Sequence, residues 1–515
     1  NDMKRCVAVN GRLLAVLSTA TWLVGAGVGC GAKDSSAERS SGALGSEAPG
    51  SAPATSEAPG MGQSNAPNAP ATPAPGLLDG AGTEGGPGAG TSLSGNGPDG
   101  TSTGGGADPA PAGPATVEPP AVTPTGELPL VYGVEDTGAD CAEPPLPAFA
   151  ALPAIVSLPD PFLMSAGERM TSRAQWRCRR AELQSILEEY DVGEKPSKPT
   201  TVNASLDGNT IRIDVSEGGT SFTMTATIGR PANAPSGPIP ALIGINTPTG
   251  SLPANIFSSR GIATITYDAN QIATTAFSNN PRNGGNFFAM YPGATAGYMV
   301  RWAWGVSRII DALEQLPEAN IDLSHLAVSG CSFQGKIALY AGAMDERIAL
   351  TIPHESGGGG TISWRYSDLL EKRDNTEVEN LLHAQGAPWY AAALQQFNND
   401  PNKLPFDHHE LIALVAPRAL LAIESTAIAR MGAEAARLDA LAAREVWTAL
   451  GVPDRMGATE ENTNHCVWHE GFTPDLEAYV DRFLLGKQDV NTDILRSKFT
   501  IDTAPWIPWS TPELE

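Results

Sequence analysis

The sequence lacks the residue patterns that several common classes of site require. Of its 515 residues, 57 are acidic and 33 are basic, which gives a formal net charge of -24 at pH 7. No basic stripe runs along the chain, so we expect no nucleic-acid partner. The chain has neither a Cys-x-x-Cys nor a His-Glu-x-x-His motif. A metal site therefore has no support, and we expect no cofactor.

Large apolar residues are almost absent from Ser36 to Thr125, where Gly, Ala, Pro, Ser and Thr dominate. Such a segment cannot bury enough surface to offset the entropy lost on ordering. We therefore predict a disordered linker over residues 31–126. The remainder, residues 127–515, is long enough to bury a sizeable core as a single domain.

No apolar run near the N-terminus is long enough to read as a spanning helix. Three basic residues precede the apolar run Leu13–Val28, which ends in small residues and Cys30. This order is typical of an export signal, here residues 1–30, and the cysteine suggests lipid attachment at Cys30. We therefore expect a secreted or cell-surface lipoprotein of a bacterium, touching the membrane only through that anchor.

Cysteine is scarce, with six in the whole chain. Two lie within the predicted signal, and the exported part keeps Cys141, Cys178, Cys331 and Cys466. An oxidising compartment permits disulfides. Four cysteines allow three pairings, and their spacing alone does not choose among them.

Short apolar runs alternate with helical patterns along the exported part. Strands are predicted at Ile239–Ile245, Gly261–Tyr267, Leu326–Ser329, Ala349–Pro353 and Ala419–Glu424, and helices at Thr171–Glu189, Ala296–Leu316, Met431–Leu450 and Asp475–Leu485. This alternation predicts an α/β fold with a mostly parallel sheet and helices on both faces. Two earlier runs, Thr210–Val215 and Ser221–Ile228, alternate in polarity and predict an antiparallel hairpin at the leading edge.

A candidate nucleophile lies where one predicted strand turns into a helix. The strand Leu326–Val328 is followed by Gly330-Cys-Ser-Phe-Gln-Gly, and Lys336–Ala343 then has a helical pattern. A sharp strand-to-helix turn needs small neighbours, exposes the Ser332 hydroxyl and directs helix N-terminal N–H groups at one point. An ordinary Gly/Ser-rich loop before a helix is the alternative.

An activated serine needs a histidine base. His465 is the best placed, in a loop just before the last predicted helix, where a hydrolase with this order of elements supplies its histidine. His354, His408 and His409 are the competitors. For the last two we expect structural roles.

Two glutamates are candidates for the acid that orients the base. Glu355 follows the strand after the nucleophile helix, before a glycine run that lets backbone approach closely. Glu424 ends the later strand Ala419–Ile423, the usual place for this acid. The Pro-His-Glu-Ser-Gly context favours Glu355, and Glu424 stays open.

Taken together, these motifs resemble those of the glucuronoyl esterases, carbohydrate esterase family 15. The family nucleophile motif is Gly-Cys-Ser-Arg-x-Gly-Lys, and this chain has Gly330-Cys-Ser-Phe-Gln-Gly-Lys336. Further similar segments run through most of the exported part: Asp160-Pro-Phe, Trp176-Arg-Cys-Arg-Arg180, Asn280-Pro-Arg-Asn-Gly-Gly285, Ile352-Pro-His-Glu-Ser-Gly-Gly-Gly359, Leu404-Pro-Phe-Asp-His-His409, Ala416-Pro-Arg418 and Asn464-His-Cys-Val-Trp468.

The resemblance implies an α/β-hydrolase fold, a three-layer sandwich over residues 127–515. It implies that Cys331 is bridged to Cys466, which leaves Cys141 to pair with Cys178. It also implies that the Phe333 backbone N–H is an oxyanion donor and that Lys336 contacts the sugar hydroxyls. We expect a monomer.

Three positions depart from the family pattern. Phe333 stands where the family has an arginine that donates to the oxyanion, and a phenylalanine side chain cannot donate. Glu379 stands where fungal members have a sugar-binding glutamine and could keep that contact. Arg430 replaces a tryptophan that packs on the sugar and could instead meet a carboxylate on the substrate.

The activity implied is hydrolysis of the ester between 4-O-methyl-D-glucuronate of glucuronoxylan and lignin alcohols, through a glucuronoyl-serine intermediate. Two alternatives remain open. One is an esterase for other aryl or acyl esters, of feruloyl or acetyl type, which the change at Phe333 suggests. The other is a catalytically weakened surface protein that binds polysaccharide, which a complete triad argues against.

Overall fold

The computed structural model describes residues 128–274, 284–384 and 388–515. All of them belong to one compact unit, Ala107–Glu515. The expectations for the signal (residues 1–30, with Cys30) and for the linker (residues 31–126) fall outside the described residues.

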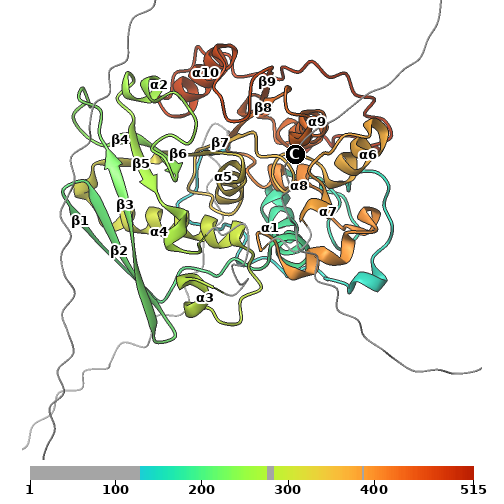
Figure 1. Ribbon diagram of the computed structural model, residues 1–515, viewed down its shortest axis with the longest axis horizontal. Coiled ribbons are helices and arrows are strands. Elements are labelled where there is room, and N and C mark those ends of the chain that lie inside the picture. Colours follow the sequence, from blue (N-terminus) through green and yellow to red (C-terminus); the bar gives the residue numbers. More distant parts are fainter. Residues whose placement is uncertain (1–127, 275–283, 385–387) are drawn as a thin grey trace, which may run out of the picture. The chain divides into compact units, whose positions relative to one another are not determined.

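The fold is built on one nine-stranded sheet, in the order β1-β2-β3-β5-β4-β6-β7-β8-β9 (Figure 1). The strands are β1 Thr201–Asp207, β2 Thr210–Glu217, β3 Thr220–Gly229, β4 Ile239–Ile245, β5 Ala263–Tyr267, β6 Ile321–Cys331, β7 Leu350–His354, β8 Ala419–Ser425 and β9 Met456–Glu461. Pairing is antiparallel from β1 through β3 to β5 and parallel across the rest. The predicted mostly parallel sheet with a leading hairpin is confirmed.

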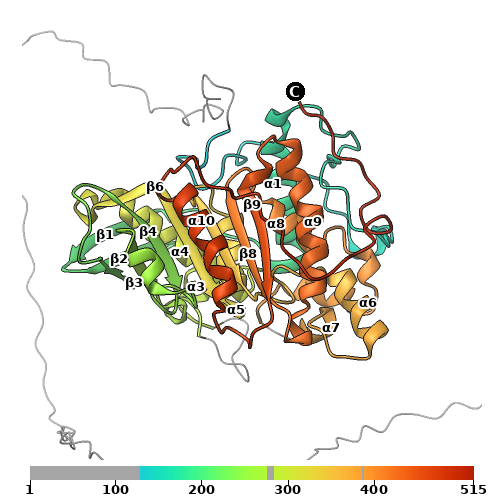
Figure 2. The same cartoon turned by 90° about the horizontal axis from the view of Figure 1, so that it is seen from above.

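Helices cover both faces of the sheet (Figure 2). They are α1 Trp176–Leu187, α2 Ala254–Ser258, α3 Asn286–Met290, α4 Tyr298–Gln315, α5 Phe333–Ala343, α6 Trp364–Asp374, α7 Leu381–Ala384, α8 His408–Ala413, α9 Ala433–Ala449 and α10 Thr473–Phe483. Successive residues of a strand face opposite ways, so in β6 Leu326 and Val328 pack with α4 and α5, while Ala327 packs with α2 and α10. Because both faces are buried, the central strands are continuously apolar.

Two strands of the sheet have no counterpart among the predicted elements. Both lie at an edge: β1 pairs only with β2, and β9 pairs only with β8. An edge strand is partly exposed, so its residues need not be continuously apolar, and β9 includes Gly457 and ends in two glutamates. The omission matters for the site, because β9 leads into the loop that carries His465.

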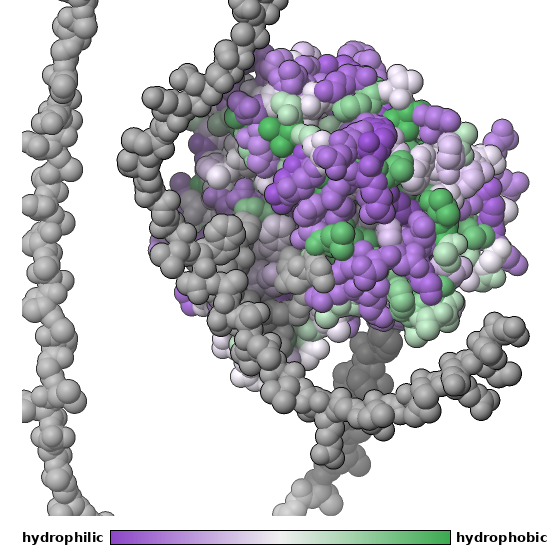
Figure 3. Space-filling model, turned by 45° about the vertical axis from the view of Figure 1, so that its right-hand side comes forward, coloured by the Kyte–Doolittle hydropathy of each residue, from purple (hydrophilic) through white to green (hydrophobic). Residues whose placement is uncertain are grey.

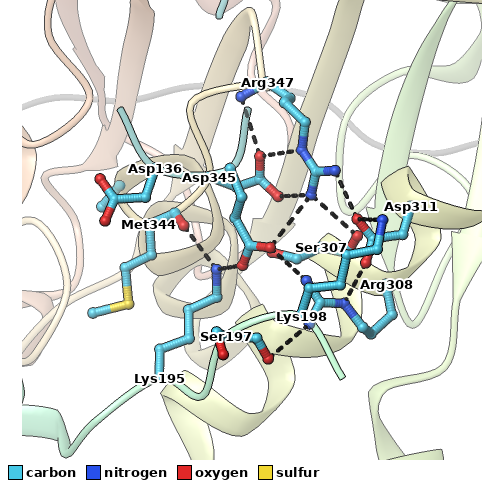
Figure 4. Close-up of polar contacts among 12 residues, drawn as sticks. Asp136, Lys195, Ser197, Lys198, Ser307, Arg308, Asp311, Met344, Asp345 and Arg347 are labelled. Atoms are coloured by element: carbon cyan, nitrogen blue, oxygen red, sulfur yellow. Dashed lines mark hydrogen bonds and ion pairs between the residues drawn. The ribbon is translucent and has the colours of Figure 1, made fainter. Parts of the chain in front are cut away.

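A network of paired charges lies just before β7 (Figure 4). The guanidinium of Arg347 contacts the carboxylates of Asp345 (2.7 Å), Asp311 (2.7 Å) and Glu314 (2.8 Å). Arg308, from the same helix as Asp311, pairs with it at 2.8 Å. Buried charges are tolerated only when paired in this way, so the network fixes α4 against the loop before β7.

Glu135 connects the start of the described chain to this network. Its carboxylate pairs with Lys195, with Arg308 at 2.5 Å and with Arg347 at 3.7 Å. Burial by itself would raise the pKa of Glu135, but the three cations outweigh it and lower that pKa to about 2. A carboxyl whose pKa falls on folding stabilises the protein above its unfolded pKa of about 4.5, and that contribution is lost as the pH falls toward 2.

Within residues 128–274, 284–384 and 388–515, no helix is both long and apolar enough to cross a lipid bilayer. On the visible face in Figure 3, hydrophilic residues predominate and hydrophobic residues form small, scattered groups. Single groups of this kind are too small to mark an interaction surface.

Replacing Glu135 by glutamine is expected to lower the free energy of unfolding at pH 7 by about 1–3 kcal/mol. Between pH 5 and pH 2 the variant should lose less stability than the wild type, because it no longer has this carboxyl to protonate. Urea unfolding at pH 7, 5 and 3 measures both effects. Glu143→Gln, at an exposed position nearby, is the control. Parallel pH profiles for Glu135→Gln and the wild type would contradict this account of Glu135.

Candidate active site

Ser332 occupies the sharp turn between β6 and α5. Its backbone is strained, with φ 62° and ψ −129°, a conformation that residues other than glycine rarely adopt. The flanking glycines permit the turn. A Cβ at Gly330 would lie 2.4 Å from the carbonyl O of Gln334, and one at Gly335 would lie 2.7 Å from the carbonyl O of His354. The Gly-x-Ser-x-x-Gly spacing is therefore a steric requirement of this turn.

The turn is tied to the neighbouring strand and opens the helix. The Ser332 N–H donates to the carbonyl O of His354 at 2.9 Å, and the Lys336 N–H donates to the carbonyl O of Ser332 at 3.1 Å. Phe333 is thus the first residue of α5. The positive end of the helix dipole lies beside the serine, where an oxyanion would form.

Glu355 directly follows β7 and is fully buried. One carboxylate oxygen, Oε2, accepts a hydrogen bond from His465 Nδ1 at 2.6 Å, and the other accepts from the Cys466 N–H at 3.2 Å. Burial opposes the charge of Glu355, but hydrogen bonds from His354 and His465 outweigh it and lower the pKa of this carboxyl below its usual range. Glu355 is therefore ionised at neutral pH.

This pairing determines which nitrogen of His465 can accept a proton. With Nδ1–H donating to the Glu355 carboxylate, the neutral ring carries its lone pair on Nε2. The His465 side chain is 36% exposed, so the ring is accessible to a ligand. A partly exposed imidazole held by a buried carboxylate is the arrangement that a general base requires.

Two disulfides join the cysteines, in the pairing that the resemblance implies. Cys331–Cys466 has a Cα–Cα distance of 5.9 Å and Cys141–Cys178 one of 5.4 Å. The first links the residue before Ser332 to the residue after His465, so it holds the nucleophile turn beside the base loop. The two sulfurs lie within 4.8 Å of a His465 ring nitrogen. They are bonded to each other and supply no thiolate to a metal.

Glu424, the alternative acid, lies in a different environment. It is buried in β8, and its Oε1 accepts a hydrogen bond from the Thr361 hydroxyl at 2.5 Å, while Oε2 has no partner in the described part of the chain. Burial, together with the neighbouring Glu355 charge, raises the pKa of Glu424 well above its ordinary value. Among the described residues, the hydrogen-bond partner of Glu424 is Thr361 and not His465.

The three candidate substrate-binding side chains lie in one row. Lys336, buried on the first turn of α5, has its Nζ 3.2 Å from Glu379 Oε2. Arg430 is 54% exposed, and its Nε lies 3.7 Å from the other oxygen of Glu379. The row therefore runs from the buried lysine through a shared glutamate to a partly exposed arginine.

The Phe333 ring packs among other aromatic residues. Its centroid is 6.0 Å from that of Trp302 and 6.4 Å from that of Trp389, to which it is nearly parallel at 18°. Trp389 also lies beneath Lys336, whose Nζ is 5.7 Å from the ring centroid. An aromatic wall thus stands where the family pattern predicts an arginine.

Comparison with known proteins places these features in a family. A family model described as glucuronyl esterase, fungi, matches residues 213–451. The 4-O-methyl-glucuronoyl methylesterase of Hypocrea jecorina is 39% identical over 380 residues, covering 73% of this chain and 80% of that protein. The enzyme of the same name from Podospora anserina is 36% identical over 426 residues, covering 78% and 87%. The chain belongs to the glucuronoyl esterase family.

Solved structures agree with the sequence match. The glucuronoyl esterase catalytic domain from Hypocrea jecorina superposes with a TM-score of 0.67 at 39% identity, covering 72% of this chain and all of that one. A serine-to-alanine mutant of the Sporotrichum thermophile glucuronoyl esterase, in complex with methyl 4-O-methyl-beta-D-glucopyranuronate, gives 0.67 at 36% identity and covers 73% and 100%. The fold is that of an α/β-hydrolase, and the protein is a carboxylic ester hydrolase.

One prediction from the sequence is wrong. We expected a lipoprotein of a bacterium, but the relatives from Hypocrea jecorina, Podospora anserina, Schizophyllum commune and Phanerochaete chrysosporium are fungal and point to a fungal origin. The expectation depended on a single cysteine after an apolar run. An apolar run followed by small residues and a cysteine says little about the organism from which a chain comes.

The structure also places at this site residues that the sequence did not single out for it. His354, considered only as a rival base, is buried with Nε2 3.2 Å from Glu355 Oε1 and Nδ1 2.5 Å from the Ser251 hydroxyl. These contacts place it beside the candidate acid. Its place beside Glu355 was a usable signal, whereas nothing in the sequence marked Ser251 or Trp389.

His408 and His409 are buried in α8. His408 Nδ1 is 2.7 Å from the carbonyl O of Gly360, and His409 Nε2 is 2.9 Å from that of Pro159. Burial lowers the pKa of His409 to about 4, so it stays neutral. These contacts hold loops together, the structural kind of role expected of them.

Glutamine at each acid position separates the two candidates. Glu355→Gln should lower kcat by about 10²–10⁴, because an amide leaves His465 without its carboxylate and free to adopt the wrong tautomer. Glu424→Gln should change kcat by no more than about threefold, because Glu424 pairs with Thr361 instead of His465 and an amide oxygen can still accept that hydrogen bond. Kinetics of both variants at pH 7, with circular dichroism to verify folding, measure the difference. The reverse ranking would make Glu424 the orienting acid.

Proposed function

We propose that this esterase cleaves the ester between 4-O-methyl-D-glucuronate of glucuronoxylan and alcohols of lignin. The observation that carries the proposal is the arrangement of Ser332, His465 and Glu355 around a disulfide-tied turn, with Lys336 one helical turn away. The relative crystallised with methyl 4-O-methyl-beta-D-glucopyranuronate supports the same class of acyl group.

The reaction follows from the roles of these three side chains. His465 Nε2 takes the proton from Ser332, whose Oγ attacks the uronate carbonyl carbon, and Glu355 stabilises the imidazolium that forms. The tetrahedral intermediate collapses, His465 returns the proton to the leaving oxygen, and the alcohol departs. Water then attacks the glucuronoyl-serine ester, with His465 again as base, and releases glucuronate and Ser332.

The start of α5 supplies the charge stabilisation. The Phe333 N–H is the oxyanion donor in this proposal, aided by the dipole of the helix that it begins. Lys336 binds hydroxyl groups of the sugar, since its ammonium lies on the same helical turn. We further propose that residues 127–515 form the catalytic domain and act as a monomer.

A second candidate function is hydrolysis of other aryl or acyl esters, of feruloyl or acetyl type. The observation that favours it is Phe333, whose ring lies between Trp302 and Trp389. An aromatic wall at the nucleophile suits an apolar acyl or alcohol group and lacks the charged donor that the family pattern has there. The two candidates differ in the ester that is turned over fastest.

The benzyl ester of D-glucuronic acid tests the proposal. The wild type should hydrolyse it, and Ser332→Ala should reduce kcat by at least about 10³, because no nucleophile remains. The rate of benzyl alcohol release, measured by chromatography, is compared with the rates of hydrolysis of feruloyl and acetyl esters of similar size. Faster turnover of a feruloyl or acetyl ester would transfer the assignment to the second candidate.

Phe333→Arg should raise kcat for the same ester by about 10–100-fold, because a guanidinium adds a donor to the developing oxyanion. Phe333→Leu is the matched control, since it removes the ring without adding a donor and should not raise kcat. Initial rates at saturating substrate measure the effect. A lower kcat for Phe333→Arg than for Phe333→Leu would show that the site no longer uses a donor at this position.

A further inference from the structure

The ammonium of Lys336 is buried. The side chain is only 2% exposed, and within the described part of the chain the carboxylate paired with its Nζ is that of Glu379, at 3.2 Å. A buried ammonium without a counter-ion is strongly unfavourable. Glu379 is therefore the counter-ion of Lys336 and holds its ammonium in place.

The Glu379 carboxylate is already engaged by neighbouring residues, chiefly through one of its oxygens. Oε2 already accepts from Lys336 Nζ and from the Gly358 N–H at 3.0 Å, and Oε1 faces Arg430 Nε at 3.7 Å. Its main-chain N–H donates to the carbonyl O of Arg430 at 2.9 Å. The side chain is 19% exposed. These contacts anchor Glu379 to three separate segments of the chain.

We propose that Glu379 is a positioning residue that acts on the substrate through Lys336, and that it makes no essential sugar contact of its own. The proposal rests on the proposed function, in which the Lys336 ammonium binds the sugar. That ammonium has three N–H groups. One N–H group is directed at Glu379, and the Trp389 ring lies 5.7 Å from the nitrogen. These two neighbours restrict the directions in which the other N–H groups can reach a sugar.

Arg430 completes the row from the outside. Its Nη1 is 3.0 Å from Glu377 Oε1, and the two side chains are 54% and 53% exposed. Pairs this exposed are screened by water and contribute little. Glu377 therefore provides a matched control, because it is a glutamate two residues from Glu379 that shares Arg430 but does not contact Lys336.

A double-mutant cycle separates action through Lys336 from direct contact. The variants are Glu379→Gln, Lys336→Gln, the double variant and Glu377→Gln. Glutamine at position 379 keeps an oxygen that can accept from the Gly358 N–H, so the change removes the charge and little else. Two quantities are measured: kcat and KM for benzyl D-glucuronate, and the thermal unfolding midpoint.

Glu379→Gln is expected to raise KM about tenfold with kcat within about twofold, the size of one charged hydrogen bond. The same replacement in the Lys336→Gln background should change KM by less than about twofold, because the group through which it acts is gone. The unfolding midpoint should follow the same pattern, falling only when Lys336 is present. Glu377→Gln should match the wild type in both measurements.

Equal increases in KM in the two backgrounds would overturn the proposal, because they would mean that Glu379 touches the substrate itself. Failure of the proposed function gives a different result. The wild type would then leave benzyl glucuronate intact while turning over another ester in a Ser332-dependent way. In that case the double-mutant cycle is measured with that ester. Increases in KM that are additive for Glu379→Gln and Lys336→Gln would then overturn the positioning role.

Discussion

The candidate active site depends on one fully buried carboxylate, that of Glu355. Hydrogen bonds from His354 and His465 outweigh burial and lower its pKa, and it also accepts a hydrogen bond from the Cys466 N–H. His465 and Cys466 lie on a loop more than a hundred residues further along the chain, so these contacts form only when β7 and the loop after β9 come together. The Cys331–Cys466 bridge holds the same two regions. The contact between Glu355 and the His465 loop thus contributes both to the fold and to the candidate site.

Charge pairing recurs at both ends of β7. Arg347 and its carboxylates lie before β7, and the site lies after it, so the two ends of one strand are each closed by a buried network. Burial, aided by the nearby charge of Glu355, instead raises the pKa of Glu424 well above its ordinary value, and the charge of Lys336 only partly offsets this. The pKa values of two glutamates at the ends of adjacent strands are thereby shifted in opposite directions.

The departures from the family pattern change the charges around the nucleophile. Phe333 replaces a cation by a ring that packs on Trp389. Nearby, Glu379 and Arg430 introduce one negative and one positive charge that face each other at 3.7 Å. These two charges offset each other, and the family fold accommodates a different set of side chains around the start of α5.

The sequence by itself determined the parallel sheet, the turn at Ser332 and the candidate base and acid, because apolar periodicity and glycine spacing are local properties of the chain. It could not detect the edge strands β1 and β9, which are only partly buried. It also left Glu355 and Glu424 open, since both end a strand. Only the tertiary structure shows that Glu355 is the one in contact with His465, because a carboxylate's pKa and its partners depend on residues far away in the chain.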